Sequence, residues 1–236
     1  MKIFAQDQLI TKQLDYKLMQ LKDKLTVKNW IDLLNTKSIL RQRNITLIES
    51  CSYSLINMKA VLDIDALQKV LLSCGILSYH DEHFYKYLID NLESILENSK
   101  SNSNWLKENE ANMLSIISSI GMLQLRDKKV LDTICKLLVN NKSASAKLVI
   151  SYVISCGFIS YQPSDKDSFD ALFKRINLKN FVLTTSKDKL GLLNYVWSLC
   201  IFDKATNEML ASVLDENFWS EFLDGKFFFS FYITVL

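Results

Sequence analysis

The side chains best suited to metal chemistry lie in one short stretch of the chain. His80 and His83 flank Asp81 and Glu82, and imidazole and carboxylate groups are common ligands of transition metals. Neighbouring side chains of one predicted turn rarely converge on one ion, and no third ligand lies nearby in the sequence. The stretch therefore favours a solvated turn, and we expect no metal and no cofactor.

Groups that could support catalysis are scattered or missing. The five cysteines, at positions 51, 74, 135, 156 and 200, contain no CxxC pair, so we interpret them as reduced core thiols. None of the strings GxGxxG, GxxxxGK[ST], GxSxG, HExxH, HRD or DFG occurs. Five glycines in 236 residues leave no phosphate-cradling loop. The sequence therefore predicts a protein that is not an enzyme.

A regular pattern places polar residues on one face of successive predicted helices. A serine recurs two positions before a repeated Gly or Cys, and another polar residue recurs four positions further upstream. The two columns are Ser73, Ser119, Ser155, Ser198 and Lys69, Ser115, Ser151, Asn194. Residues four apart share a helix face, and some helical-repeat proteins read each RNA base with side chains from one repeat. The alternative is that small hydroxyl residues let neighbouring helices approach closely, and both interpretations stay open.

Basic and aromatic residues extend this candidate RNA surface. Arg126, Lys128 and Lys129 lie at a predicted helix end or turn, where they could meet backbone phosphates. Bases stack on tryptophan rings in many single-strand-binding proteins. Because Trp197 lies at the edge of an apolar helix stripe, next to Val196, we expect it to pack in the core instead.

An internal repeat organises the elements that carry these residues. SCGIL at 73–77, SIGML at 119–123 and SCGFI at 155–159 recur, and SLCIF at 198–202 has Cys in place of Gly. Their spacings of 46, 36 and 43 residues lie within the range of two-helix repeats. Apolar residues flank each copy in steps of one, three and four, which predicts a helix with one buried stripe.

Each repeated helix is followed by a turn and a second apolar segment. The polar residues that close the four helices are Ser78, Gln124, Ser160 and Asp203, and the predicted linkers between hairpins are 99–104, 140–145 and 184–189. We therefore predict an all-α fold, an α-solenoid of antiparallel helix-hairpin repeats. Residues 60–226 form the repeat array, 1–59 form N-terminal helices or a degenerate cap repeat, and 227–236 form an unrelated apolar tail.

Composition agrees with this fold and limits the partners. One proline and five glycines argue against turn-rich β architectures. A net charge of +2 gives no global field for a polyanion, so any contact with RNA must come from a local patch. The longest uncharged run, 148–164, is shorter and more polar than the roughly 20 apolar residues of a spanning helix, so we expect no membrane span.

The C-terminal part of the chain resembles a known family. Residues 188–226 are similar to the leucine-rich region of the FAST kinase domain-containing family, most specifically in VWSLC at 196–200, in VL-x3-FW at 213–219 and in the final DGK. Residues 71–84 and 152–169 are similar to earlier repeats of the same array, so the resemblance extends over about 60–226.

The resemblance implies a function that the residues alone do not. It implies a mitochondrial protein that binds single-stranded RNA, namely mitochondrial transcripts, and acts in RNA processing, mRNA stability or translation. Members of the family also carry a C-terminal RAP domain, and we expect this chain to be a fragment without it. The alternative is a non-catalytic scaffold for other proteins. An RNA-binding array predicts a basic and polar groove, whereas a scaffold predicts an apolar or mixed-charge face.

Overall fold

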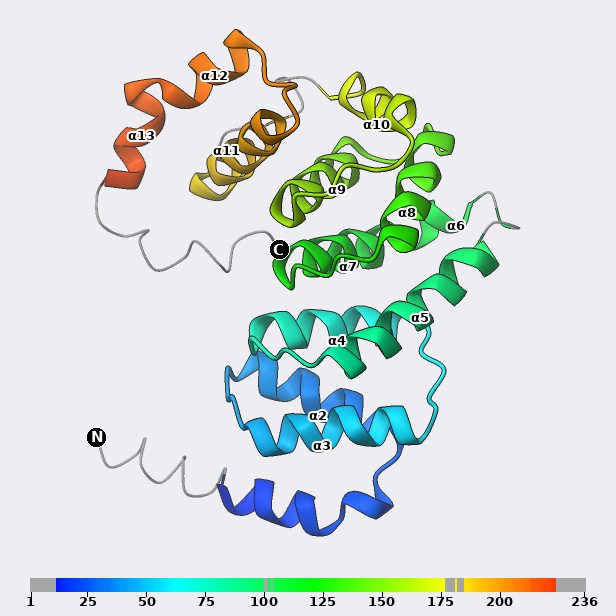
Figure 1. Ribbon diagram of the computed structural model, residues 1–236. Coiled ribbons are helices and arrows are strands. Elements are labelled where there is room, and N and C mark those ends of the chain that lie inside the picture. Colours follow the sequence, from blue (N-terminus) through cyan, green and yellow to red (C-terminus); the bar gives the residue numbers. More distant parts are fainter. Residues whose placement is uncertain (1–11, 100–101, 103, 177–180, 182–184, 224–236) are drawn as a thin grey trace. The chain divides into compact units, whose positions relative to one another are not determined.

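The computed structural model describes residues 12–99, 102, 104–176, 181 and 185–223 (Figure 1). Within these ranges every regular element is a helix and no strand occurs, which confirms the all-α prediction. The chain divides into two compact units, Met1–Leu88 and Ile89–Leu236. The predicted tail at 227–236 lies outside the described residues.

The first unit consists of helices joined by short turns. Residues 12–20 are helical and are followed by a 3-10 turn, η1 (Lys22–Lys24), and by α2 (Val27–Ile39), α3 (Ile45–Asn57) and α4 (Ile64–Ile76). The next helix, α5 (Glu82–Ser99), begins in this unit and ends in the second. α2 packs against both α3 and α4. Trp30, Leu47 and Leu67 are almost fully buried in the resulting core.

The second unit repeats this arrangement with more helices. Its elements are α6 (Trp105–Glu108), α7 (Glu110–Met122), α8 (Lys128–Asn140), α9 (Ala146–Ile159), α10 (Lys166–Phe173), α11 (Ser186–Ile201), α12 (Asn207–Leu214) and α13 (Glu216–Leu223). The first helices of successive hairpins pack side by side, with α9 between α7 and α11, while α8 packs against α10 (Figure 1). Hairpins therefore stack in sequence order within the unit. A continuous solenoid through both units stays a prediction.

The first helix of every hairpin ends in the same backbone motif. One residue at the C-cap or directly after it adopts a left-handed conformation with φ between 48° and 55°, and these residues are Arg41, Ser78, Gln124, Ser160 and Asp203. The next amide donates back to a carbonyl in the last turn, as from Tyr79 to Cys74 and from Tyr161 to Cys156. This is the Schellman motif, which satisfies carbonyls at the helix end. Four of the five residues are the predicted closing residues.

The fifth residue, Arg41, reveals a hairpin that the sequence signature does not mark. Ser38 stands three positions before Arg41, where later repeats carry Gly75, Gly121 and Gly157. α2 and α3 therefore form a hairpin of the same design in the region predicted to be a cap or degenerate repeat. The signature is absent there because Thr36 and Ser38 stand where the later copies carry serine and glycine or cysteine.

Acidic or hydroxyl side chains begin many of the helices. Asp81, Asp127 and Asp165 each accept a hydrogen bond from the amide three residues further on, which satisfies one of the free donors at a helix N-terminus. The predicted linker 184–189 extends too far, because α11 already begins at Ser186. Thr185 caps α11 and forms a capping box with Asp188, because the TxxD sequence satisfies two amides at once.

Among the described residues, no helix has the length and hydropathy to cross a membrane.

Candidate nucleic-acid interface

The serine column lies in the packing between helices. Ser73, Ser119, Ser155 and Ser198 are almost completely buried. Ser155 donates to the carbonyl of Ile117 on the neighbouring α7 at 2.8 Å, and Ser198 donates to the carbonyl of Asn194 within its own helix at 2.8 Å. These hydroxyls expose almost no surface to a ligand, and their contacts are those that the packing interpretation expects.

The second polar column divides into buried and partly exposed members. Ser151 and Asn194 are buried, and Ser151 shares a 2.9 Å hydrogen bond with Ser118 of α7. They too are unsuited to contact RNA. Ser115 is half-buried. Lys69 is partly exposed, and its ammonium lies 2.7 Å from the Asp65 carboxylate one turn earlier in α4.

The repeated glycines explain why the serines are buried. A Cβ atom added to Gly121 would lie 2.8 Å from Ser155 Cα, and one added to Gly157 would lie 2.6 Å from Ser198 Cβ. Each glycine therefore receives the serine of the next hairpin at a distance that no larger residue permits. Ser38 and Ser73 repeat this contact in the first unit, where Ser73 donates to Ser38 at 3.1 Å. The glycine and serine columns therefore face each other and together allow close helix packing.

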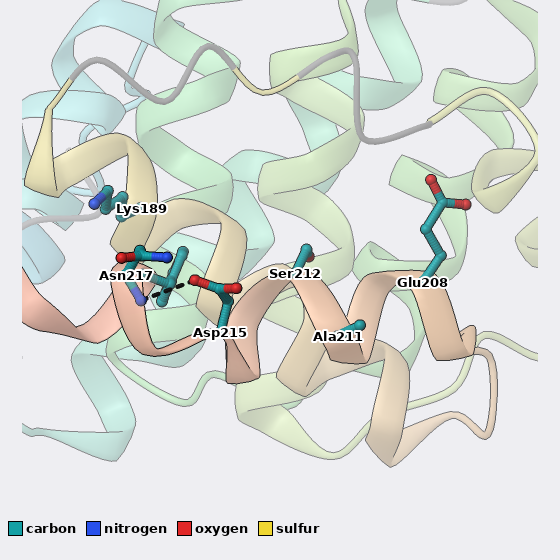
Figure 2. Close-up of a pocket in the computed structure, with 7 residues that line it drawn as sticks. Lys189, Glu208, Ala211, Ser212, Asp215 and Asn217 are labelled. Atoms are coloured by element: carbon teal, nitrogen blue, oxygen red, sulfur yellow. Dashed lines mark hydrogen bonds between the residues drawn. The ribbon is translucent and has the colours of Figure 1, made fainter.

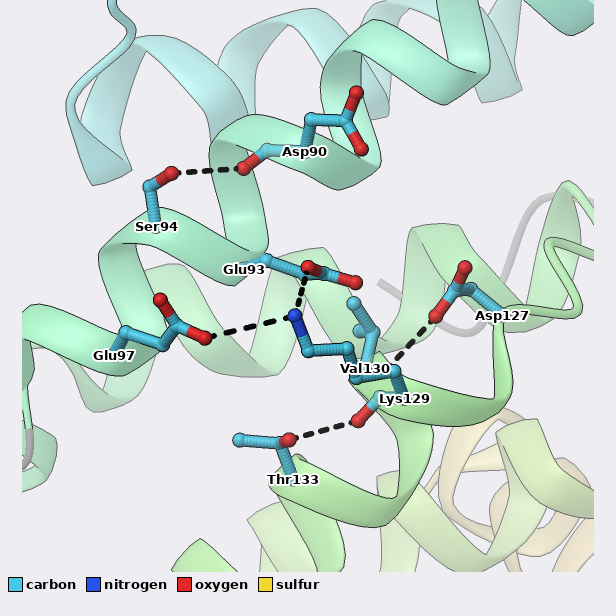
Figure 3. A network of polar contacts seen from close by, with 8 residues as sticks. All are labelled: Asp90, Glu93, Ser94, Glu97, Asp127, Lys129, Val130 and Thr133. Carbon is cyan, nitrogen blue, oxygen red and sulfur yellow. Dashed lines mark hydrogen bonds and ion pairs between the residues drawn. The ribbon is translucent and has the colours of Figure 1, made fainter.

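The predicted basic cluster after α7 is only partly available. Lys129 Nζ lies 2.6 Å from Glu93 and 3.6 Å from Glu97, both on α5 (Figure 3). The hydrogen bond to Glu93 and the charges of both glutamates raise the pKa of Lys129 above its usual value. This lysine therefore joins α8 to α5 through carboxylates. Arg126 and Lys128 are exposed and remain candidates for phosphate contact.

Two further arginines act as caps, which sequence reasoning missed. Arg175 donates to the carbonyls of Leu138 at 2.7 Å and Ala144 at 2.8 Å, around the end of α8. Arg43 donates to the carbonyl of Ser78 at 3.2 Å. Helix C-termini present free carbonyls and partial negative charge, which guanidinium groups stabilise. Only the three-dimensional neighbours distinguish these cations from ligand-binding ones.

Trp197 corrects another expectation, since it does not pack in the core. The residue is 46% exposed. Its indole ring lies against Phe158 of α9, with ring centroids 5.6 Å apart. Ile201, one turn further along α11, is 38% exposed. We call Phe158, Trp197 and Ile201 the aromatic patch.

The remaining polar features do not gather around a single point. His80 and His83 are exposed, and the described residues contain no group of three or more possible metal ligands. An open hollow of about 550 Å³ lies along α12 and the start of α13. Figure 2 shows that its labelled side chains, from Lys189 of α11 to Glu208 of α12, are spread along the helices rather than directed at one centre.

The cysteines allow a direct chemical check of these burial assignments. Burial raises the pKa of Cys51 and of Cys135 to about 12, and it raises the pKa of Cys74 and Cys156 as well. Cys200 is exposed. Because the thiolate is the reactive form, we expect one fast-reacting thiol per native chain with Ellman's reagent at pH 8. All five should react after denaturation. Cys200→Ser should remove the fast phase, and two or more fast thiols would contradict the packing described above.

The fold and these surfaces define an all-α protein built from stacked helix hairpins, with two exposed candidate contact regions. Residues 149–223, from α9 to α13, match the family model described as FAST kinase-like protein, subdomain 1. This match confirms the sequence resemblance to the FAST kinase-like family over these residues. The hairpins before residue 149 lie outside the matched segment. No curated protein matches the chain.

Proposed function

We propose that this chain is a mitochondrial RNA-binding protein that acts in post-transcriptional regulation, through RNA processing, mRNA stability or translation. The observation that carries the proposal is the family match over residues 149–223, because membership of the FAST kinase-like family suggests association with RNA. In this proposal the protein contributes binding rather than catalysis.

The proposed contact with phosphates is made by exposed cations of the second unit. The buried serines offer no such contact, and Lys129 is held between two glutamates. Arg126 and Lys128 flank the α8 N-cap, Asp127, and both side chains are exposed. Arginine and lysine bind phosphates through charge and hydrogen bonds, and this part of the affinity is sensitive to salt.

The proposal is tested by measuring RNA affinity across salt. We expect the purified chain to bind a single-stranded 20-nucleotide RNA with an affinity that falls as KCl rises. The logarithmic slope changes by about 0.7 for each phosphate contact to a single strand, so Arg126→Ala/Lys128→Ala should lower it by about 1.4. Fluorescence anisotropy at several KCl concentrations measures this slope.

A charge-matched variant controls for the loss of two positive charges. Lys136 and Lys174 are exposed cations elsewhere in the second unit, and replacing both by alanine should leave the slope nearly unchanged. Equal losses in both double variants would mean that only net charge matters. No salt-dependent affinity in the parent chain would contradict the RNA proposal itself.

A protein-binding scaffold is the second candidate, and one observation favours it. The aromatic patch is partly exposed and uncharged, whereas Lys69, Lys129 and Lys204 are in ion pairs with carboxylates of their own unit. An apolar exposed surface is typical of sites that bind another protein. The RNA measurement above separates the two functions.

A further inference from the structure

Trp197 of α11 packs against one ring of α9 and leaves much of its remaining surface in solvent. Large aromatic side chains contribute most to stability when they are buried, as Trp30 is in the first unit. Trp197 instead leaves 46% of its surface in solvent, in the middle of a helix whose neighbouring residues Val196 and Ser198 are buried. The exposed part of the ring contributes no hydrophobic stabilisation and is available to a ligand.

The packing of the helices holds the aromatic patch in a fixed place. Phe158 directly follows Gly157, and Trp197 directly precedes Ser198, so the close contact of Gly157 with Ser198 brings the two rings together. The rings are tilted by 49°. Ile201 extends the patch one turn along α11, because residues four apart share a helix face. The rings are therefore held before any ligand arrives, which lowers the entropic cost of binding.

The same helical position is apolar and at least partly exposed in other hairpins. Phe158 follows the small residue of α9 directly, and the corresponding residues of α2 and α4 are Ile39, 70% exposed, and Ile76, 38% exposed. Met122 holds this position in α7 and is half-buried, and Ile201 holds it in α11. Within each unit, each of these hairpins thus carries an apolar residue at one fixed position, which is the arrangement that repeat proteins use to contact one ligand unit per repeat.

The charges on α9 and α11 favour a polyanion whose uncharged part covers the patch. α9 contains one charged residue, the exposed Lys147, and no carboxylate. Lys147 lies 11 residues before Phe158, about 16 Å along the helix axis. In α11 every position from Leu190 to Ile201 is uncharged, and the one carboxylate, Asp188, closes the capping box. The bases of a nucleic acid have flat faces that fit the aromatic patch, and its phosphates carry the negative charge that Lys147 would attract.

We propose that the aromatic patch is a stacking platform for unpaired bases of single-stranded RNA, with Trp197 as the principal contact and Lys147 as a neighbouring phosphate contact. The proposal rests on the RNA-binding function proposed above and assigns a site to it. Stacking on aromatic side chains tolerates every base, so the site favours single strands without a strong sequence preference.

The test compares three variants in binding to a fluorescein-labelled 20-nucleotide oligouridylate. Trp197→Ala should weaken binding about 5- to 150-fold, the fold-change equivalent to the 1–3 kcal/mol that stacking contributes per base. The salt slope should not change, because no phosphate contact is lost. Trp197→Phe should retain most of the affinity. Tyr53→Ala removes another exposed aromatic residue, 69% exposed on α3, and should bind as the parent does.

Two further measurements separate stacking from a general loss of affinity. RNA should quench tryptophan fluorescence of the parent, and Trp197→Phe should remove that quenching. A double-stranded RNA of the same length has no unpaired bases, so its weaker, phosphate-driven binding should not depend on Trp197. Circular dichroism should show unchanged helicity in every variant, because Trp197 and Tyr53 are exposed.

The outcomes that overturn the proposal differ from those that overturn the function. If the parent binds RNA and Trp197→Ala binds equally well, the patch is not a base platform, RNA binding stands, and an apolar protein partner becomes the better occupant. Stacking is also overturned if Trp197→Ala reduces the salt slope, or if it lowers the affinity for single-stranded and double-stranded RNA equally. If the parent binds no RNA, both proposals fail.

Discussion

Replacing Gly157 by alanine is expected to destabilise the protein by about 2 kcal/mol, although alanine is the better helix former. Alanine gains about 1 kcal/mol over glycine in a helix interior. The added Cβ atom, however, would lie 2.6 Å from Ser198 Cβ and 3.1 Å from Ser198 Cα. Overpacking costs typically about 1–3 kcal/mol, and we expect the upper end because the backbones of α9 and α11 must separate.

Two control variants test whether the close contact with Ser198 causes this loss of stability. Gly191 lies in α11, and a Cβ atom added to it would meet nothing within 4 Å. Gly191→Ala should therefore stabilise the protein by about 0.5–1 kcal/mol. The double variant Gly157→Ala/Ser198→Gly removes the serine side chain that the new methyl group meets, and it should recover part of the loss. Urea denaturation followed by circular dichroism measures all three. A stabilised Gly157→Ala protein would show that the two helices are not in close contact.

The second large effect concerns a buried ion pair in the first unit. Asp15, in the helix at 12–20, lies 2.6 Å from Lys37 of α2, and their side chains are 9% and 7% exposed. Asp15 also accepts a 2.8 Å hydrogen bond from Asn44, and Lys37 donates to Gln42 at 3.0 Å. Removing one partner leaves a buried charge without compensation, so Lys37→Met or Asp15→Leu should each cost about 3–5 kcal/mol.

The double variant distinguishes desolvation from simple loss of attraction. Asp15→Leu/Lys37→Met removes both buried charges and should recover most of the stability, because apolar residues of similar size replace buried ion pairs well. Lys69 and Asp65 form a matched control at 2.7 Å, with side chains 38% and 59% exposed. Exposed pairs contribute about 0–1 kcal/mol, so Lys69→Met should have a small effect in the same urea titration. Equal costs for Lys37→Met and Lys69→Met would contradict the buried position of the first pair.

Local patterns in the sequence determine where most helices begin and end. Ser78, Gln124, Ser160 and Asp203 close the first helices as predicted, and each adopts the left-handed conformation of a Schellman motif. Apolar residues in steps of three and four identify the buried stripe of each helix, because the helical repeat of about 3.6 residues sets that spacing. These interactions involve residues close together in the sequence, so a single chain reveals them. The first hairpin lies in the region predicted as N-terminal helices or a degenerate repeat, because Thr36 and Ser38 interrupt the repeated signature there.

The exposure of individual polar side chains depends on the neighbouring helix, which periodicity does not describe. A column of serines has the same spacing whether it faces solvent or another helix, and only the approach of Ser155 to Gly121 decides that it is buried. Lys128 and Lys129 are adjacent and of one type, so the sequence does not separate them. The carboxylates that hold Lys129 come from α5, and Glu93 stands 36 residues earlier in the chain.

Trp197 shows most clearly what only the tertiary structure decides. Its sequence neighbours place it at the edge of an apolar stripe, which predicts burial, and Val196 beside it is buried as expected. The packing of α9 against α11 leaves the indole 46% exposed beside Phe158. The sequence by itself therefore determined the helices, most of their ends and the resemblance to a family over residues 149–223. The packing of one hairpin on the next decided which polar residues are buried and that Trp197 stays partly exposed, because those contacts join residues that lie far apart in the chain.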